Sequence, residues 1–190
     1  MRLDLNPQYT LDAQGWLQGE GSRIDSQNFD ERPQSCEIEA VIIHSISLPE
    51  GDYRKDNVDR LFTNCMDYSR DQSFEDLKGV EVSSHFLIRR GGNLVQFVST
   101  EKRAWHAGES VCLGKTRAND FTIGIELEGC DYESFTLAQY QKLLSLSKVI
   151  RKRYPRIRKD AFFAHSEIAP ERKTDPGPHF RWELLMKGLN

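Results

Sequence analysis

The stretch Glu39–Ser47, EAVIIHSIS, places Val41, Ile42 and Ile43 in an unbroken apolar run that ends at His44. A continuous apolar run, rather than an alternation of apolar and polar residues, is typical of a strand that is covered on both faces of a sheet. We therefore expect this strand to lie at the centre of the fold.

Several segments around this strand also have recognisable patterns. NVDRLFTNC predicts a helix, SSHFLIRRGGNLVQFVS predicts a hairpin that turns at Gly91 and Gly92, and FTIGIELEG and DAFFAHS predict two further strands. Strands and helices interleave without a regular βαβ rhythm. The sequence therefore predicts a mixed α/β fold, in which a single domain has a central mixed sheet flanked by helices.

The clearest helix signal is TLAQYQKLLSLSKVIRKRYP, residues 136–155. Thr136 can cap the first backbone amides, Gln139 stands at the reciprocal position of a capping box, and Pro155 closes the segment. The cations of Lys148–Lys159 indicate the end of a helix, because the negative end of the helix dipole favours positive charge. A nucleic-acid patch is an alternative interpretation of this run. RWELLMKGL predicts a short final helix. The inward stripe of the long helix is expected to contain Leu137, Tyr140, Leu143, Leu144, Ser147 and Ile150.

Length and composition limit the class of protein. The 190 residues suit one domain, which we place at 36–190 behind an N-terminal arm at 1–35 that packs on it. A net charge of −3 gives no general attraction to nucleic acid or anionic lipid, and no apolar run is long enough to span a membrane. Four dispersed cysteines and an amino terminus unlike a secretory signal predict reduced thiols. We expect a cytoplasmic monomer that binds neither nucleic acid nor membrane.

The segment His165–Pro178, HSEIAPERKTDPGP, is too rich in proline for a helix or a central strand. His44 and His165 each follow a short apolar strand, so neighbouring strands would bring both imidazoles to one edge of the sheet. Asp175 precedes a proline, which restricts it to extended conformations. Two histidines and a carboxylate would give zinc three protein ligands and leave a fourth position for water. Taken singly, however, each histidine is more often a core residue, and His85, His106 and His179 compete because spacing does not rank them.

Hydrolysis at such a site also needs a base and a group that steadies negative charge. Glu126 lies on the polar face of its strand among apolar neighbours that would raise its pKa, but Glu128 points the same way, so alternation does not choose between them. Lys173 could place its ammonium over a developing oxyanion, or it could be an ordinary solvated lysine.

The blocks VIIHSISLP, HFLIRRGGNLVQFV, RAWHAG, NDFTIGIELEG and HSEIAPERKTDPGP together resemble the zinc N-acetylmuramoyl-L-alanine amidases of the AmpD type, in the family's order and over about residues 36–185. The resemblance implies a mixed sheet with flanking helices and a zinc ion held by His44, His165 and Asp175. It also implies that Glu126, rather than Glu128, is the catalytic glutamate and that Lys173 is its partner in catalysis.

The resemblance further implies the substrate. Such enzymes cleave the amide bond between the lactyl group of (anhydro-)N-acetylmuramic acid and L-alanine in cytosolic peptidoglycan recycling, and they release the stem peptide. Arg117 would hold a peptide carboxylate as a bidentate fork, while Ala104, Trp105, Arg172 and Ser45 would line the substrate groove. Ser45 and Glu81 depart from the family pattern, which has Asn and, in some members, Arg at these positions. The alternative is a related peptidoglycan recognition module that binds muropeptide without cutting it.

Overall fold

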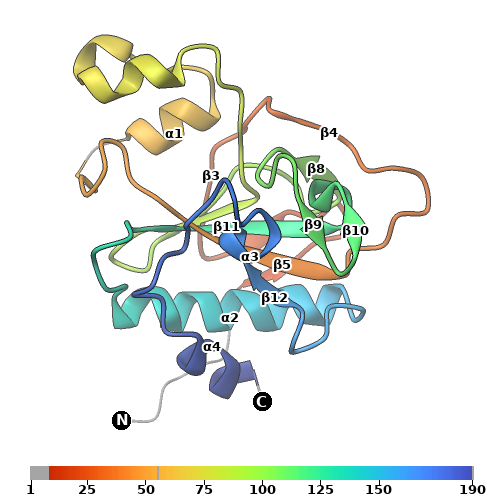
Figure 1. The fold of residues 1–190 in the computed structure, drawn as a ribbon. Helices are drawn as coiled ribbons and strands as arrows, with labels where there is room; N and C mark the ends of the chain where they lie inside the picture. Colours follow the sequence, from red (N-terminus) through yellow and green to blue (C-terminus); the bar gives the residue numbers. More distant parts are fainter. Residues whose placement is uncertain (1–8, 55, 190) are drawn as a thin grey trace.

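A six-stranded mixed sheet forms the centre of the molecule in the computed structural model, which describes residues 9–54 and 56–189 (Figure 1). The strand order is β12-β5-β11-β6-β7-β3, and every neighbouring pair is parallel except the antiparallel β6–β7 hairpin. This sheet confirms the predicted mixed α/β architecture. Its strands are β3 (Ser22–Arg23), β5 (Ala40–Ile46), β6 (Phe86–Ile88), β7 (Leu94–Gln96), β11 (Thr122–Glu128) and β12 (Phe162–Ala164).

The apolar run of β5 lies at the centre of the parallel part of the sheet, as predicted. β5 pairs with β11 on one side and with β12 on the other, and Val41, Ile42 and Ile43 are completely buried. In the register between β5 and β11, His44 lies opposite Glu126. Residues paired in this way point to the same face of the sheet, so the register places an imidazole beside a carboxylate.

One face of the sheet packs on the long helix α2 (Leu137–Arg153), with the final helix α4 (Trp182–Leu189) beyond it (Figure 1). The predicted capping box of α2 is present: Gln139 N donates to Thr136 Oγ1 at 3.1 Å, and Thr136 N donates to Gln139 Oε1 at 3.0 Å. The core covers α2 only from Gln139 onward, so the prediction that Leu137 faces inward is wrong, and this side chain is 59% exposed. No described helix is long and apolar enough to cross a lipid bilayer.

The opposite face of the sheet carries a second, smaller apolar cluster. Leu87 of β6 points into it while its neighbours Phe86 and Ile88 point toward α2, as strand alternation requires. Helix α1 (Asn57–Phe62) covers this cluster, and Phe62 meets Phe97 edge to face at 5.1 Å between ring centroids. Two short 3-10 helices, η1 (Tyr68–Arg70) and η2 (Gln72–Leu77), follow α1.

Residues 9–35 lie against the sheet as short strands and loops. β1 (Tyr9–Leu11) pairs with β2 (Leu17–Gly19), and β4 (Phe29–Glu31) pairs with β8 (Lys102–Ala104). Arg32 is anchored by donating hydrogen bonds to the carbonyls of Asn119, Asp120 and Thr122 at 3.0, 2.8 and 2.9 Å. The remaining short elements are β9 (Val111–Cys112), β10 (Lys115–Thr116), η3 (Ala118–Asp120) and α3 (His165–Ile168).

Candidate active site

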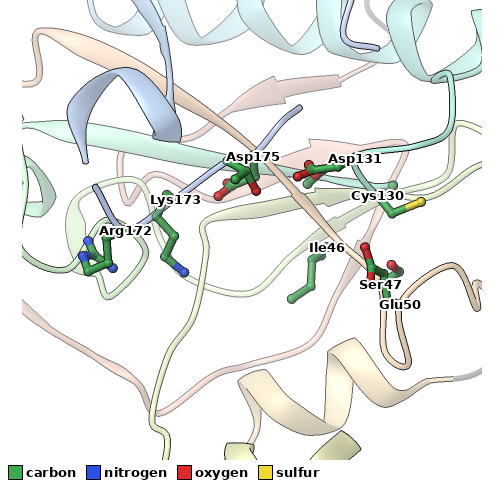
Figure 2. A pocket seen from close by; sticks show the side chains of 11 residues that line it. Ile46, Ser47, Glu50, Cys130, Asp131, Arg172, Lys173 and Asp175 are labelled. Carbon is green, nitrogen blue, oxygen red and sulfur yellow. The ribbon is translucent and has the colours of Figure 1, made fainter. Parts of the chain in front are cut away.

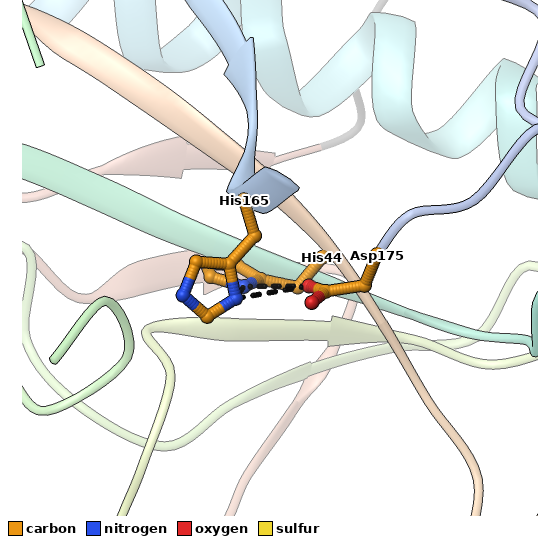
Figure 3. Close-up of side chains that lie close together, drawn as sticks. All are labelled: His44, His165 and Asp175. Carbon is orange, nitrogen blue, oxygen red and sulfur yellow. Dashed lines mark hydrogen bonds and ion pairs between the residues drawn. The ribbon is translucent and has the colours of Figure 1, made fainter. Parts of the chain in front are cut away.

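His44, His165 and Asp175 converge at the carboxyl edge of the parallel strands (Figure 3). Residue Ala164 of β12 lies opposite Ile43 of β5, so the residues that follow, His165 and His44, come together. Their local setting differs from the sequence prediction in one respect. β5 continues to Ile46 because pairing with β11 extends through Glu128, so His44 lies within its strand, and His165 is the first residue of α3.

The three side chains present a triangle of ligand atoms. The Nδ1 atoms of His44 and His165 are 3.0 Å apart, and each lies 3.1 Å from Asp175 Oδ2. Tetrahedral coordination of a divalent ion with bonds of about 2.0–2.2 Å separates neighbouring ligand atoms by about 3.3 Å. Two imidazoles and a carboxylate in this arrangement fit a metal ion that keeps a further position open, as in catalytic rather than closed structural sites.

The electrostatics of the triangle suit a cation. Burial lowers the pKa of His44 to about 4, although the hydrogen bond with Asp175 acts in the opposite direction. Burial raises the pKa of Asp175, but its hydrogen bonds to His165 and His44 outweigh this and hold it well below the usual range. The site therefore offers a neutral imidazole and an ionised carboxylate near neutral pH, which are the forms that ligate metals.

Imidazole contacts outside the triangle orient the rings. His165 Nε2 donates to the carbonyl oxygen of Ala107 at 3.2 Å, because a carbonyl can only accept, and this leaves Nδ1 as the atom that would face a metal ion. His44 Nε2 lies 3.0 Å from Nδ1 of His106. Ligating histidines in metal sites are held in this way through their second ring nitrogen.

Two glutamates that strand alternation could not distinguish have different surroundings. Glu128 accepts hydrogen bonds from Arg89 Nη1 and from the backbone N of Arg90, both at 2.8 Å, and is committed to an ion pair. Glu126 is 8% exposed, and its Oε2 has no hydrogen-bond partner among the described residues. Burial raises the pKa of Glu126 well above its usual value, the charge of Asp175 adds to this, and Lys173 opposes it. Glu126 is therefore the glutamate whose environment suits proton transfer.

The loop between α3 and Asp175 forms one wall of a cleft of about 340 Å³ beside the triangle (Figure 2). Lys173 and Arg172 stand at one end of this cleft, and Glu50 and Asp131 stand at the other. Arg172 is fixed there because its Nη2 donates to the carbonyls of Ala107 and Glu109 at 2.8 and 2.7 Å. For the ammonium of Lys173, the described part of the chain provides no ion pair, so its charge is available to a ligand. Ser45 also lines this cleft.

A second cleft of about 330 Å³ lies on the other side of Lys173. Trp105 and Arg172 line it, as does Glu81. Ala104, by contrast, is completely buried at the end of β8 and lines neither cleft. Arg117 also lies outside both linings: its side chain is 67% exposed and its Nε pairs with Asp120 Oδ2 at 3.1 Å.

The remaining histidines occupy distinct places. His179 is exposed, whereas His85 and His106 are buried next to each other, with ring centroids 5.7 Å apart. Sequence reasoning gave His106 no separate role, because its contact with His44 spans 62 positions and follows no local spacing. Gly124 of β11 is also related to this contact, since a Cβ there would lie 2.5 Å from His106 Cγ.

The chain is similar to several known proteins. A family model described as N-acetylmuramoyl-L-alanine amidase matches residues 34–178. The 1,6-anhydro-N-acetylmuramyl-L-alanine amidase AmpD of Citrobacter freundii is 46% identical over 169 residues, which cover 89% of each chain. A crystal structure of a selenomethionine AmpD derivative superposes with a TM-score of 0.90 at 43% identity, covering 95% of this chain and 99% of that one.

A third comparison shows a relative with a ligand. The amidase AmiD of Escherichia coli, solved in complex with the substrate anhydro-N-acetylmuramic acid-L-Ala-D-γ-Glu-L-Lys, has a TM-score of 0.60 and 29% identity, with coverage of 95% of this chain and 65% of that one. The family match spans residues 34–178, and the superposition with the AmpD derivative covers nearly the whole of both chains. The protein belongs to the N-acetylmuramoyl-L-alanine amidase family.

Proposed function

We propose that this protein is a zinc-dependent amidase that cleaves the bond between the lactyl group of 1,6-anhydro-N-acetylmuramic acid and L-alanine, and so releases the stem peptide. One observation carries the proposal: a buried carboxylate with an unpartnered oxygen, Glu126, stands beside a triangle of two imidazoles and a carboxylate. The similarity to AmpD relatives supports the choice of substrate.

His44, His165 and Asp175 would hold the ion. Zinc supplies a Lewis acid for the scissile carbonyl and lowers the pKa of water to about 7. Glu126 accepts the proton of the attacking water as the oxygen bonds to the carbonyl carbon. It then gives the proton to the alanine nitrogen as the C–N bond breaks. Its raised pKa suits both steps, because a base that is too acidic would hold the proton too weakly.

Lys173 stabilises the negative charge on the carbonyl oxygen in the tetrahedral state. Its position between the two clefts supports this role, because a substrate that spans both clefts passes the ammonium at the point of cleavage. Ser45 in the first cleft and Trp105 in the second would contact the substrate, and Arg172, which lines both clefts, would contact it from either side. Ala104 and Arg117 remain predicted substrate contacts.

The reaction belongs to peptidoglycan recycling, and we place it in the cytoplasm, with the protein acting as a monomer. Its four free cysteines support a reducing compartment.

Mass spectrometry of a purified reaction tests the proposal. Metal-stripped protein is incubated with anhydro-muropeptide before and after addition of zinc, and the free stem peptide is quantified. Zinc should restore release of the peptide. Tight binding of the muropeptide without any release, in the presence of bound zinc, would instead identify a recognition module.

A further inference from the structure

A chain of buried polar groups leads from His44 away from the metal triangle. His44 Nε2 lies 3.0 Å from His106 Nδ1, and His106 Nε2 lies 3.3 Å from the hydroxyl oxygen of Thr122. That hydroxyl donates to the carbonyl of Ala118 at 2.7 Å. His44, His106 and Thr122 are 1%, 9% and 0% exposed, so solvent does not compete for these contacts.

The last member of the chain fixes the direction of every hydrogen bond in it. The Ala118 carbonyl can only accept, so the single proton of the Thr122 hydroxyl points to it. The Thr122 oxygen therefore accepts from His106 Nε2. With the proton on Nε2, a neutral His106 has an accepting Nδ1, and His44 Nε2 donates to it. His44 Nε2 is thus a donor in this chain, and with a metal ion in place His44 Nδ1, the atom that faces His165 and Asp175, would hold the ion.

The surrounding backbone is shaped to hold the His106 ring. Gly124 of β11 leaves room for it, since a Cβ at this position would lie 2.5 Å from His106 Cγ. Asn119 Oδ1 accepts from the backbone N of His106 at 3.2 Å and from that of Ala107 at 2.8 Å. The same short segment thus supports both histidines of the triangle, His44 through the His106 ring and His165 through the Ala107 carbonyl.

We propose that His106 is a positioning residue which, anchored by Thr122, holds His44 in the tautomer that directs its Nδ1 lone pair at the metal. His165 is fixed directly by a backbone carbonyl, whereas His44 depends on this relay of two side chains. The inference rests on the proposed zinc site, but its test measures metal affinity and the position of a proton rather than turnover. Failure of wild-type protein to bind zinc would refute the site itself.

Three variants test the relay at different points. His106→Leu removes both ring contacts, His106→Asn keeps an amide oxygen able to accept from His44, and Thr122→Val removes the anchoring hydroxyl with little change of shape. Zinc affinity is measured by competition with a chromophoric chelator. We expect His106→Leu to weaken zinc binding by about 10–100-fold, the size of effect typical of lost outer contacts to a ligating histidine. His106→Asn and Thr122→Val should fall between this variant and the wild type.

The matched control is His85→Gln. His85 is a second buried histidine on the same part of the sheet, where its Nδ1 accepts from Gly124 N at 3.0 Å. The His85→Gln substitution should lower the melting temperature without a comparable loss of zinc affinity. An equal loss in His85→Gln would attribute the effect to general disturbance of the sheet and overturn the proposal.

Ring-nitrogen NMR shifts of His106 in the zinc-loaded wild type give an independent readout. They should show His106 with its proton on Nε2 and an accepting Nδ1. A zinc-loaded His106 protonated on Nδ1, or an unchanged zinc affinity in folded His106→Leu or Thr122→Val, would contradict the proposal. Because Thr122→Val preserves shape, it keeps the test decisive where His106→Leu does not fold.

Discussion

Glu126 and His44 are register partners on β11 and β5, yet Glu126 Oε2 has no hydrogen-bond partner among the described residues. Two positions further along the same strand, Glu128 is held by Arg89 and by the backbone of Arg90. Leaving a buried carboxylate oxygen unpaired is unfavourable for folding, so the contrast indicates a group kept for chemistry rather than for stability.

The two glutamates provide a matched pair of substitutions. Glu126→Gln should reduce kcat by about a hundredfold to ten-thousandfold, the usual contribution of a general base, while zinc stays bound. Glu128→Gln should instead leave kcat nearly unchanged and lower stability by about 1–3 kcal/mol, because it breaks a largely buried ion pair. Steady-state kinetics and denaturant unfolding of both variants measure these effects. A Glu128→Gln variant that is stable but inactive would reverse the assignment.

The raised pKa of Glu126 predicts a pH-dependent effect on stability. The folded state favours the protonated carboxyl, so its stabilising contribution is present below the unfolded pKa near 4.5 and is lost as the pH rises through the folded pKa. Metal-free Glu126→Gln, which stays neutral, should melt several degrees above metal-free wild type at about pH 8 and at the same temperature at about pH 4. Melting curves across this range test the sign. A wild type that is the more stable protein at high pH would show that the ionised carboxylate is stabilised in the fold.

Lys173 should contribute to turnover and not to metal binding. Lys173→Met keeps the length of the side chain and removes its charge, so we expect a loss in kcat of about a hundredfold or more, or about 2.7–4 kcal/mol, typical of a lost oxyanion donor. Zinc content measured on the purified variant should equal that of the wild type. Full activity in a zinc-loaded Lys173→Met protein would show that Lys173 does not stabilise the oxyanion.

Arg117 is predicted to hold a carboxylate of the stem peptide. Its side chain is largely exposed and pairs with Asp120, so Arg117→Ala should raise KM with little change in kcat and little loss of stability. Anhydro-muropeptides whose stem peptides have or lack a free terminal carboxylate distinguish recognition from a general effect. Equal KM values for both muropeptides with wild type and variant would remove Arg117 from the substrate site.

Local sequence patterns predict much of the fold. The apolar run of β5 and the capping box of α2 were sufficient because both signals lie within a few residues. The inward orientation predicted for Leu137 failed because periodicity does not reveal where the core stops covering a helix. The sequence pattern does not predict the strands within residues 9–35, because these strands are short and rich in polar residues.

Local patterns predict less of the candidate site, because its residues come from different strands. Histidines that follow apolar strands indicated His44 and His165 as metal ligands, and the family resemblance supplied the choice between Glu126 and Glu128. The physical reason for that choice, the commitment of Glu128 to Arg89, is a contact between β11 and the end of β6 that alternation along one strand does not contain. The role of His106 likewise depends on Thr122 and Gly124 from another strand.

Cleavage in water enriched in heavy oxygen tests whether Glu126 activates water for attack on the lactyl carbonyl. Zinc-loaded protein is incubated with anhydro-muropeptide in this solvent, with Glu126→Gln as the control, and the two products are weighed by mass spectrometry. We expect one heavy oxygen in the lactyl carboxylate of the sugar, none in the released stem peptide, and almost no product with Glu126→Gln. Label in a peptide carboxylate, or equal product with the variant, would contradict this expectation.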